Sequence, residues 1–214
     1  MLSCISRQNR PAILAGTALS FLLFRCDLFQ KESGSDLSAL ALVLAGSCNC
    51  QIGNVCFSTS GSVPCQSGVA SGTGSLIASS LVSDDLSVQV TFQLSSGGQL
   101  EFIGGANPNS TFDSSAGANI TIPATGNLKS TSDGGAGVAG PGTAAVTYCM
   151  EHHVEESPIH QILDKATCAS KLATAASYEY DASGPSAAGG RWGFILTNAQ
   201  ISGITRNASR FFTE

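Results

Sequence analysis

The chain has 214 residues, of which only 12% are charged, and its formal net charge at pH 7 is −5. Its ten basic side chains are scattered along the sequence, whereas a nucleic-acid surface needs clustered Lys and Arg, so we expect no nucleic-acid partner. The 24 glycines and the scarcity of charge favour one β-rich domain with many turns over a helical bundle.

The N-terminal segment has the order of a secretory signal peptide. Two arginines form a basic start, an uncharged apolar run of 14 residues occupies positions 11–24, and Arg25 and Cys26 follow. A membrane-spanning helix needs about 20 apolar residues, so residues 1–25 are predicted to be a cleaved signal rather than a span. The alternative is a buried N-terminal helix. We expect Cys26 to carry the lipid anchor of the mature protein, with palmitate among its acyl chains.

A second cysteine, Cys48, is the alternative lipidation site, because small residues precede it. Cleavage before Cys26 leaves an even number of further cysteines for disulfides, whereas cleavage before Cys48 leaves an odd thiol. This favours Cys26, with a tether and a short apolar segment at residues 26–47 and the folded domain at residues 48–214. The further cysteines are Cys48, Cys50, Cys56, Cys65, Cys149 and Cys168.

The start of this chain resembles that of spirochaete surface lipoproteins. The likeness rests on residues 24–31 (FRCDLFQK), the polar linker and leucine-rich patch after them, and the sequence Cys48-Asn49-Cys50. It implies an exported protein anchored by lipid in a bacterial membrane, at the outer membrane or cell surface.

Four cysteines lie within residues 48–65, at the start of the predicted domain. A structural zinc site usually shows paired C-x-x-C spacings, but the spacings here are C-x-C, C-x5-C and C-x8-C. We therefore expect disulfides, and three pairings of these four cysteines are open.

Residues 86–94 give the clearest strand, because apolar and polar side chains alternate along them. Residues 95–98 (SSGG) have the composition of a turn, and residues 99–103 are predicted to return as the partner strand of a hairpin. Further strands are predicted at residues 119–122, 144–150, 159–163, 191–198 and 199–204, separated by Gly-, Ser- and Asn-rich loops.

This pattern predicts an all-β fold, a two-sheet antiparallel sandwich of jelly-roll type held by disulfides. Two short motifs, Trp192-Gly193-Phe194 and the strand from Tyr148 to Glu151 with Cys168 after it, resemble concanavalin-like and laminin-G-like jelly rolls. If Cys149 and Cys168 pair, they close a loop of about 20 residues, worth roughly 3 kcal/mol.

The three histidines lie close together, with carboxylates among them. A hairpin that brings His152, His153, His160 and Glu155 together would bind Zn²⁺ or respond to pH. The simpler interpretation, which we favour, is a solvated, acidic hairpin tip. Ca²⁺ is a second candidate ion, although Asp and Asn residues are common in turns. The candidate residues in the predicted loops are Asn107, Asn109, Asp113, Asp133 and Asp181.

The predicted role is binding, adhesion or surface structure, with a glycan or a protein as the ligand, held by loops at the sandwich rim. One alternative is a carbohydrate-active enzyme on the same fold. No Glu-x-Asp-x-x-Glu pattern or Gly-x-Ser-x-Gly elbow supports catalysis, so no catalytic residue is assigned. The other alternative is a metal- or pH-responsive module at residues 152–160.

Overall fold

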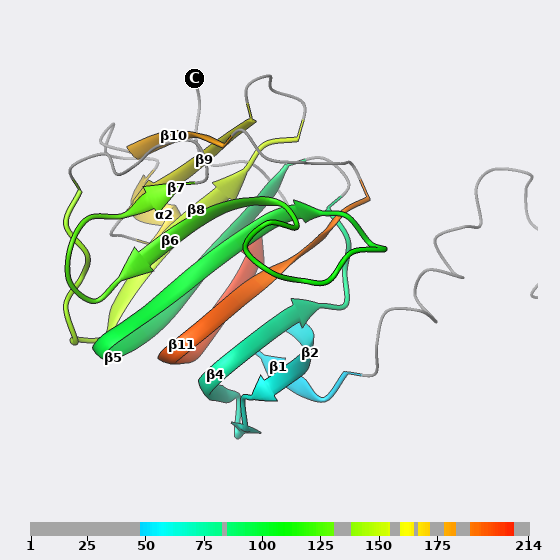
Figure 1. Cartoon of the computed structure of the whole chain (residues 1–214), viewed down its shortest axis with the longest axis horizontal. Helices are drawn as coiled ribbons and strands as arrows, with labels where there is room; N and C mark the ends of the chain where they lie inside the picture. Colours follow the sequence, from blue (N-terminus) through cyan, green and yellow to red (C-terminus); the bar gives the residue numbers. More distant parts are fainter. Residues whose placement is uncertain are drawn as a thin grey trace, which may run out of the picture. The chain divides into compact units, whose positions relative to one another are not determined.

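Figure 1 shows the computed structural model of the chain. It describes residues 48–82, 85–130, 138–154, 159–164, 167–171, 178–182 and 189–207, all of which belong to one structural unit. The predicted signal peptide and tether, with Cys26, lie outside the described residues, and so does Glu155. Within the described ranges, no helix is both long enough and apolar enough to cross a membrane.

The described residues form β-strands and one helical turn. The strands are β1 (Cys50–Ile52), β2 (Val55–Ser62), β3 (Cys65–Gln66), β4 (Val69–Ala78), β5 (Leu86–Ala106), β6 (Ala118–Pro123), β7 (Lys129–Ser130), β8 (Val146–His152), β9 (Ile159–Asp164), β10 (Tyr178–Ala182) and β11 (Arg191–Asn207), and the helix is α2 (Cys168–Lys171).

Hydrogen bonds connect these described strands into one eleven-stranded sheet, and the pairings between them are antiparallel. The main path runs β1-β2-β4-β11-β5-β8-β9-β10, with β3 beside β4, β6 beside β5, and β7 beside β6. The expectation of an antiparallel, disulfide-containing β domain with almost no helix is therefore confirmed.

Two long strands, β5 and β11, form the centre of the sheet and pair along almost their whole length (Figure 1). The predicted hairpin of residues 86–94 with 99–103 is wrong, because both segments belong to β5 and pair with β11. Leu94 lies opposite Ala199 and Gln99 lies opposite Thr197, so residues 95–98 are extra residues opposite Asn198. The SSGG sequence therefore forms an irregularity within one strand rather than a turn between two.

The two halves of β5 have different outer neighbours. The first half pairs with β8 through residues 86–92, whereas the second half pairs with β6 through residues 99–104. The halves nevertheless share one buried face, since Leu94 before the irregularity and Leu100 after it are both buried in the same apolar cluster.

The main core lies on this shared face. Aromatic rings line it: Phe92 packs edge-on against Tyr148 at 5.2 Å between ring centroids, and Phe102 lies 5.6 Å from Phe194. Trp192 and Phe57 extend the contact at 5.8 Å. Each fully buried apolar side chain of this kind is worth about 1.5–3 kcal/mol, so this face supplies most of the driving force for folding.

A smaller apolar cluster covers the opposite face of the sheet near the end of β5. Ile103 and Ala106 of β5 pack there with Phe112 and Ala116, which belong to the connection between β5 and β6. That connection was predicted to be a plain loop. In the structure it folds back over the sheet, and this explains why the last residues of β5 are buried on both faces.

All six cysteines of the domain are in disulfides. The pairs are Cys48–Cys56, Cys50–Cys65 and Cys149–Cys168, with Cα–Cα distances of 5.6, 5.5 and 4.8 Å. The first two select one of the three pairings that the spacing left open. The third joins β8 to α2.

Candidate functional site

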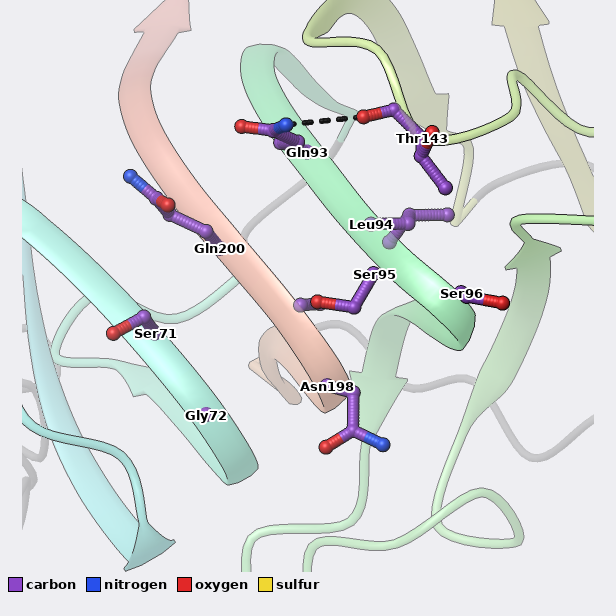
Figure 2. Close-up of a pocket in the computed structure, with 10 residues that line it drawn as sticks. Ser71, Gly72, Gln93, Leu94, Ser95, Ser96, Thr143, Asn198 and Gln200 are labelled. Atoms are coloured by element: carbon purple, nitrogen blue, oxygen red, sulfur yellow. Dashed lines mark hydrogen bonds between the residues drawn. The ribbon is translucent and has the colours of Figure 1, made fainter.

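A polar groove of 490 Å³ lies where β4, β11 and β5 run side by side at the irregularity of β5 (Figure 2). We call it the bend groove. It is lined by Ser71, Gly72, Gln93, Leu94, Ser95, Ser96, Thr143, Asn198, Ala199 and Gln200.

A row of polar side chains crosses the three strands of the bend groove. Ser71 of β4 is the register partner of Gln200 in β11, and Gln200 is the partner of Gln93 in β5. Neighbouring strands are about 4.8 Å apart, so this row spans roughly 10 Å. The Gln93 amide donates a hydrogen bond to the Thr143 carbonyl at 3.0 Å (Figure 2), which fixes one end of the row.

Asn198 forms the rim of the bend groove in an unusual backbone conformation. Its φ is 48°, a left-handed value that Asn tolerates better than most residues. Its backbone N–H donates to the Thr73 hydroxyl at 3.1 Å. β4 therefore holds the Asn198 backbone in place, while the Asn198 side chain remains exposed.

The bend groove contains no ionisable side chain among its described lining residues. Its amides and hydroxyls can donate and accept hydrogen bonds. It offers neither the acid and base of proton-transfer catalysis nor the paired carboxylates of glycoside hydrolysis. The arrangement therefore has the chemistry of a binding site for a neutral, polar ligand.

Sequence reasoning did not find the bend groove. The alternation in residues 86–94 places Gln93 on the outer face, but Gln93 and Gln200 are more than 100 residues apart in the chain. Only the strand register, which periodicity does not encode, brings them together.

The expected solvated tip at the histidines is wrong for the residues that the structure describes there. Glu151, His152 and His153 each have 0% exposed surface. His152 points toward the main core, where its ring lies against the backbone of Gly104. Burial lowers the pKa of His152 to about 4, and the neighbouring His153 acts in the same direction.

Glu151 and His153 lie on the other face of β8 from His152 and contact each other. The His153 Nε2 and the Glu151 Oε2 are 3.1 Å apart. This face of β8 is covered near α2, where the Cys168 N–H donates to the Gln89 side chain at 3.2 Å. A buried pair of this kind is costly to break, so it is part of the domain's structure.

The metal site at His152, His153, His160 and Glu155 stays a prediction, because Glu155 and the side chain of His160 lie outside what the structure describes. The register pairs His152 with Gln161, and the same register continued by one residue would set His160 opposite His153. In the ranges that the structure describes, no group of three or more His, Cys, Asp or Glu residues could hold a metal ion.

Two candidate Ca²⁺ residues stabilise turns in the structure. The Asn107 side chain accepts a hydrogen bond from the Asn109 N–H at 2.9 Å. The Asp113 carboxylate accepts from the Ser115 hydroxyl and N–H at 2.6 and 2.9 Å, and the hydroxyl bond, then the N–H bond, lower the pKa of Asp113. Local turn formation accounts for both residues.

Comparison with known proteins returns no family model that matches this chain and no curated protein that matches it.

Proposed function

We propose that this chain is an exported lipoprotein whose β domain binds a ligand outside the cytoplasm, on a tether anchored in a bacterial membrane at the outer membrane or cell surface. The observation that carries the proposal is the pairing of every cysteine from Cys48 onward in a disulfide. Disulfides persist in oxidising compartments and are rare in the cytosol, so the pairing supports export.

The proposal takes Cys26, rather than Cys48, as the lipid anchor. The Sγ atom of Cys48 is bonded to Cys56, and a sulfur in a disulfide cannot also form the thioether of a diacylglyceryl group. The pairing of six cysteines within the domain leaves Cys4, inside the proposed signal peptide, and Cys26, which would be the first residue of the mature chain. This supports a tether over residues 26–47.

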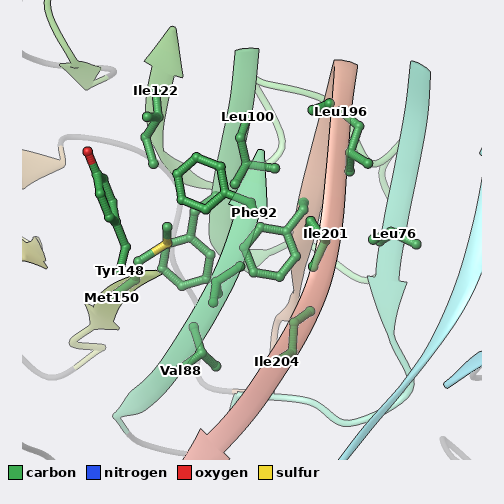
Figure 3. Close-up of a cluster of buried hydrophobic side chains, with 14 of the residues drawn as sticks. Leu76, Val88, Phe92, Leu100, Ile122, Tyr148, Met150, Leu196, Ile201 and Ile204 are labelled. Atoms are coloured by element: carbon green, nitrogen blue, oxygen red, sulfur yellow. The ribbon is translucent and has the colours of Figure 1, made fainter. Parts of the chain in front are cut away.

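We also propose that the continuous sheet is organised as a two-layered sandwich of jelly-roll type. Figure 3 shows side chains of β4, β5, β6, β8 and β11 gathered in one buried cluster. His152, the register partner of Leu86 at the start of β5, lies against Gly104 near the end of β5. A straight strand of 21 residues spans about 70 Å. The contact therefore supports a β5 that doubles back, with its halves facing each other across the core.

The proposal puts ligand binding in the bend groove, at the irregularity of β5. Its uncharged amides and hydroxyls fit a neutral hydrogen-bonding ligand, and a glycan is the ligand class that we favour over a protein. The lack of carboxylates in its described lining favours binding over the alternative of a carbohydrate-active enzyme.

Mass spectrometry of the protein from native membranes tests the anchor and the compartment. We expect a diacylglyceryl group on Cys26 and a non-reduced mass lower than the reduced mass by the hydrogens of three disulfides. A Cys26→Ser variant should leave the membrane fraction. An unmodified N-terminus at Cys26, or free thiols in the native protein, would contradict the proposal.

A glycan array with purified domain tests the groove. Gln200→Ala removes an exposed amide from the centre of the polar row, and losing a ligand hydrogen bond of about 1 kcal/mol should weaken binding roughly five- to tenfold. Gln66→Ala, which removes an exposed glutamine from the short strand β3, is the matched control. Equal binding by both variants would exclude the bend groove as the site.

A further inference from the structure

A second groove, of 360 Å³, lies where the β1–β2 turn meets the end of β11. We call it the Arg206 groove. It is lined by Gln51, Asn54, Val55, Cys56, Ser79, Ser80, Arg206 and Asn207.

The backbone of Arg206 is fixed by the β1–β2 turn. The Asn54 amide donates to the Arg206 carbonyl at 2.9 Å, and the Arg206 N–H donates to the Asn54 carboxamide oxygen at 2.8 Å. Because the Asn54 side chain makes both bonds, it fixes the backbone of Arg206 and therefore the position of the Arg206 side chain at the groove.

The guanidinium of Arg206 lies over Trp192, 5.9 Å from the ring centroid. One of its nitrogens donates to the Leu81 carbonyl at a long 3.4 Å. The Trp192 indole N–H in turn donates to the Ser80 hydroxyl at 3.2 Å. The guanidinium is thus packed against the buried indole ring of Trp192.

The charge of Arg206 has no counter-ion in the part of the chain that the structure describes. The contact between a basic and an acidic side chain found there joins His153 to Glu151, although the whole chain has fifteen acidic side chains against ten basic ones. Burial lowers the pKa of the half-buried Arg206. A partly desolvated cation costs free energy unless it is paired, and a guanidinium has five N–H donors in a fork that matches an oxyanion.

We infer that the Arg206 groove binds the oxyanion group of a small ligand, a carboxylate, sulfate or phosphate. Arg206 supplies the charge and the fork of donors, and the neighbouring serine and amide side chains supply neutral hydrogen bonds. This site is separate from the bend groove and does not depend on the function proposed above.

The chain carries its own reporter of this site, because Trp192 is its single tryptophan. The test titrates the domain with sodium sulfate, sodium phosphate and sodium glucuronate, with sodium chloride at equal ionic strength as the reference. The readouts are Trp192 fluorescence and the NMR shift of its indole N–H. We expect a saturable response to at least one oxyanion and none to chloride.

Three variants test whether the Trp192 response to oxyanions arises from binding in the Arg206 groove. Arg206→Gln should weaken the affinity about tenfold or more, because it removes a charge-assisted hydrogen bond. Gln51→Glu leaves Arg206 in place and adds a negative charge to the exposed wall of the groove, so it should weaken the affinity several-fold. Lys129→Gln, which removes an exposed cation in β7, is the control and should bind as the original chain does.

The inference is overturned if the folded protein gives no saturable response, or if Gln51→Glu and Lys129→Gln bind with equal affinity. Far-UV circular dichroism checks that Arg206→Gln folds. If that variant does not fold, the comparison of Gln51→Glu with Lys129→Gln decides alone.

Discussion

Three ionisable side chains that the sequence analysis expected in solvent are buried in the interior of this domain. Glu151, His152 and His153 follow one another in a charged stretch, which suggested solvent. Cys149, on the same face as Glu151 and His153, is bonded to Cys168, and this brings α2 over that face. The Cys149–Cys168 disulfide holds α2 on the face of β8 that carries Glu151 and His153, whereas His152 is buried on the other face, against Gly104.

The depressed pKa of His152 makes the stability of the domain depend on pH. The folded-state pKa of about 4 is below the ordinary value of 6.5, so between these values the unfolded chain binds the proton and the folded chain does not. The contribution of His152 is therefore intact above about pH 6.5 and is lost as the pH falls toward 4. At about 1.4 kcal/mol per pKa unit, the loss from this group is of the order of 3 kcal/mol.

Urea unfolding at a series of pH values measures this effect. We expect the free energy of unfolding of the original protein to fall between pH 6.5 and pH 4, and His152→Phe to show a shallower fall, whatever its stability at pH 7. Identical slopes for the two proteins would show that His152 does not titrate in this window.

At the scale of elements, the sequence predicted those strands whose buried face carries large apolar side chains. Residues 86–94 and 119–122 lie in β5 and β6, and the predicted segment 144–150 overlaps β8, which begins at Val146. The predicted segment 159–163 also coincides with a strand, β9. The sequence analysis did not predict β4, because small residues interrupt the alternation of large apolar and polar side chains that marks a strand. Gly72 and Gly74 have φ values of 119° and 149°, and a Cβ on either would collide with the backbone carbonyls of β2.

The false hairpin has a different cause. A turn signal such as SSGG is compatible both with a chain reversal and with extra residues inside a strand, and only the partner strand decides between them. That partner, β11, lies about 100 residues further along the chain. The bend groove was missed for the same reason, since it consists of residues that β11 brings beside β4 and β5.

A double-mutant cycle tests whether the two ends of β5 approach each other. A Cβ on Gly104 would overlap the His152 ring, so Gly104→Ala should destabilise the domain by about 1–3 kcal/mol. In a His152→Ala background, the two ring atoms nearest to that Cβ are removed and only the Cβ of residue 152 stays close, at 2.9 Å. The cost of Gly104→Ala should therefore be clearly smaller than in the original protein, a departure from additivity.

Gly203→Ala is the control for this cycle, because a Cβ there would make only ordinary contacts with Thr91. Its effect on the free energy of unfolding should be the same in both backgrounds. Additive effects for Gly104→Ala and His152→Ala would contradict the contact between His152 and Gly104, on which the doubling back of β5 rests.

At the scale of the whole molecule, the sheet is assembled from segments that are distant in sequence. The central strand, β11, comes last among the described strands and lies between β4 and β5. Topologies dominated by such long-range pairs fold slowly, in milliseconds to seconds. The cysteine-rich segment at the start of the domain is local by comparison, and its two disulfides close within residues 48–65.

A chain truncated after Gly190 should therefore fail to fold. Without β11, the hydrogen-bonding edges of β4 and β5 are unpaired, and an exposed edge is a site of aggregation. We expect the truncated chain to lack a cooperative thermal transition and to form Cys149–Cys168 with lower yield than the original protein. Calorimetry and disulfide mapping measure both, and a cooperative transition would show that β11 is dispensable.

The late position of β11 has a consequence for a chain that crosses a membrane through a narrow channel with its N-terminus first. If this chain is exported as proposed, the cysteine-rich segment emerges first, but the sheet cannot close until residues 191–207 have followed. During this interval the unpaired edges and the aromatic face of the core are open to water. The order of the strands would thus keep an exported chain unfolded until β11 has crossed, and a chaperone on the receiving side would protect its exposed edges during that interval.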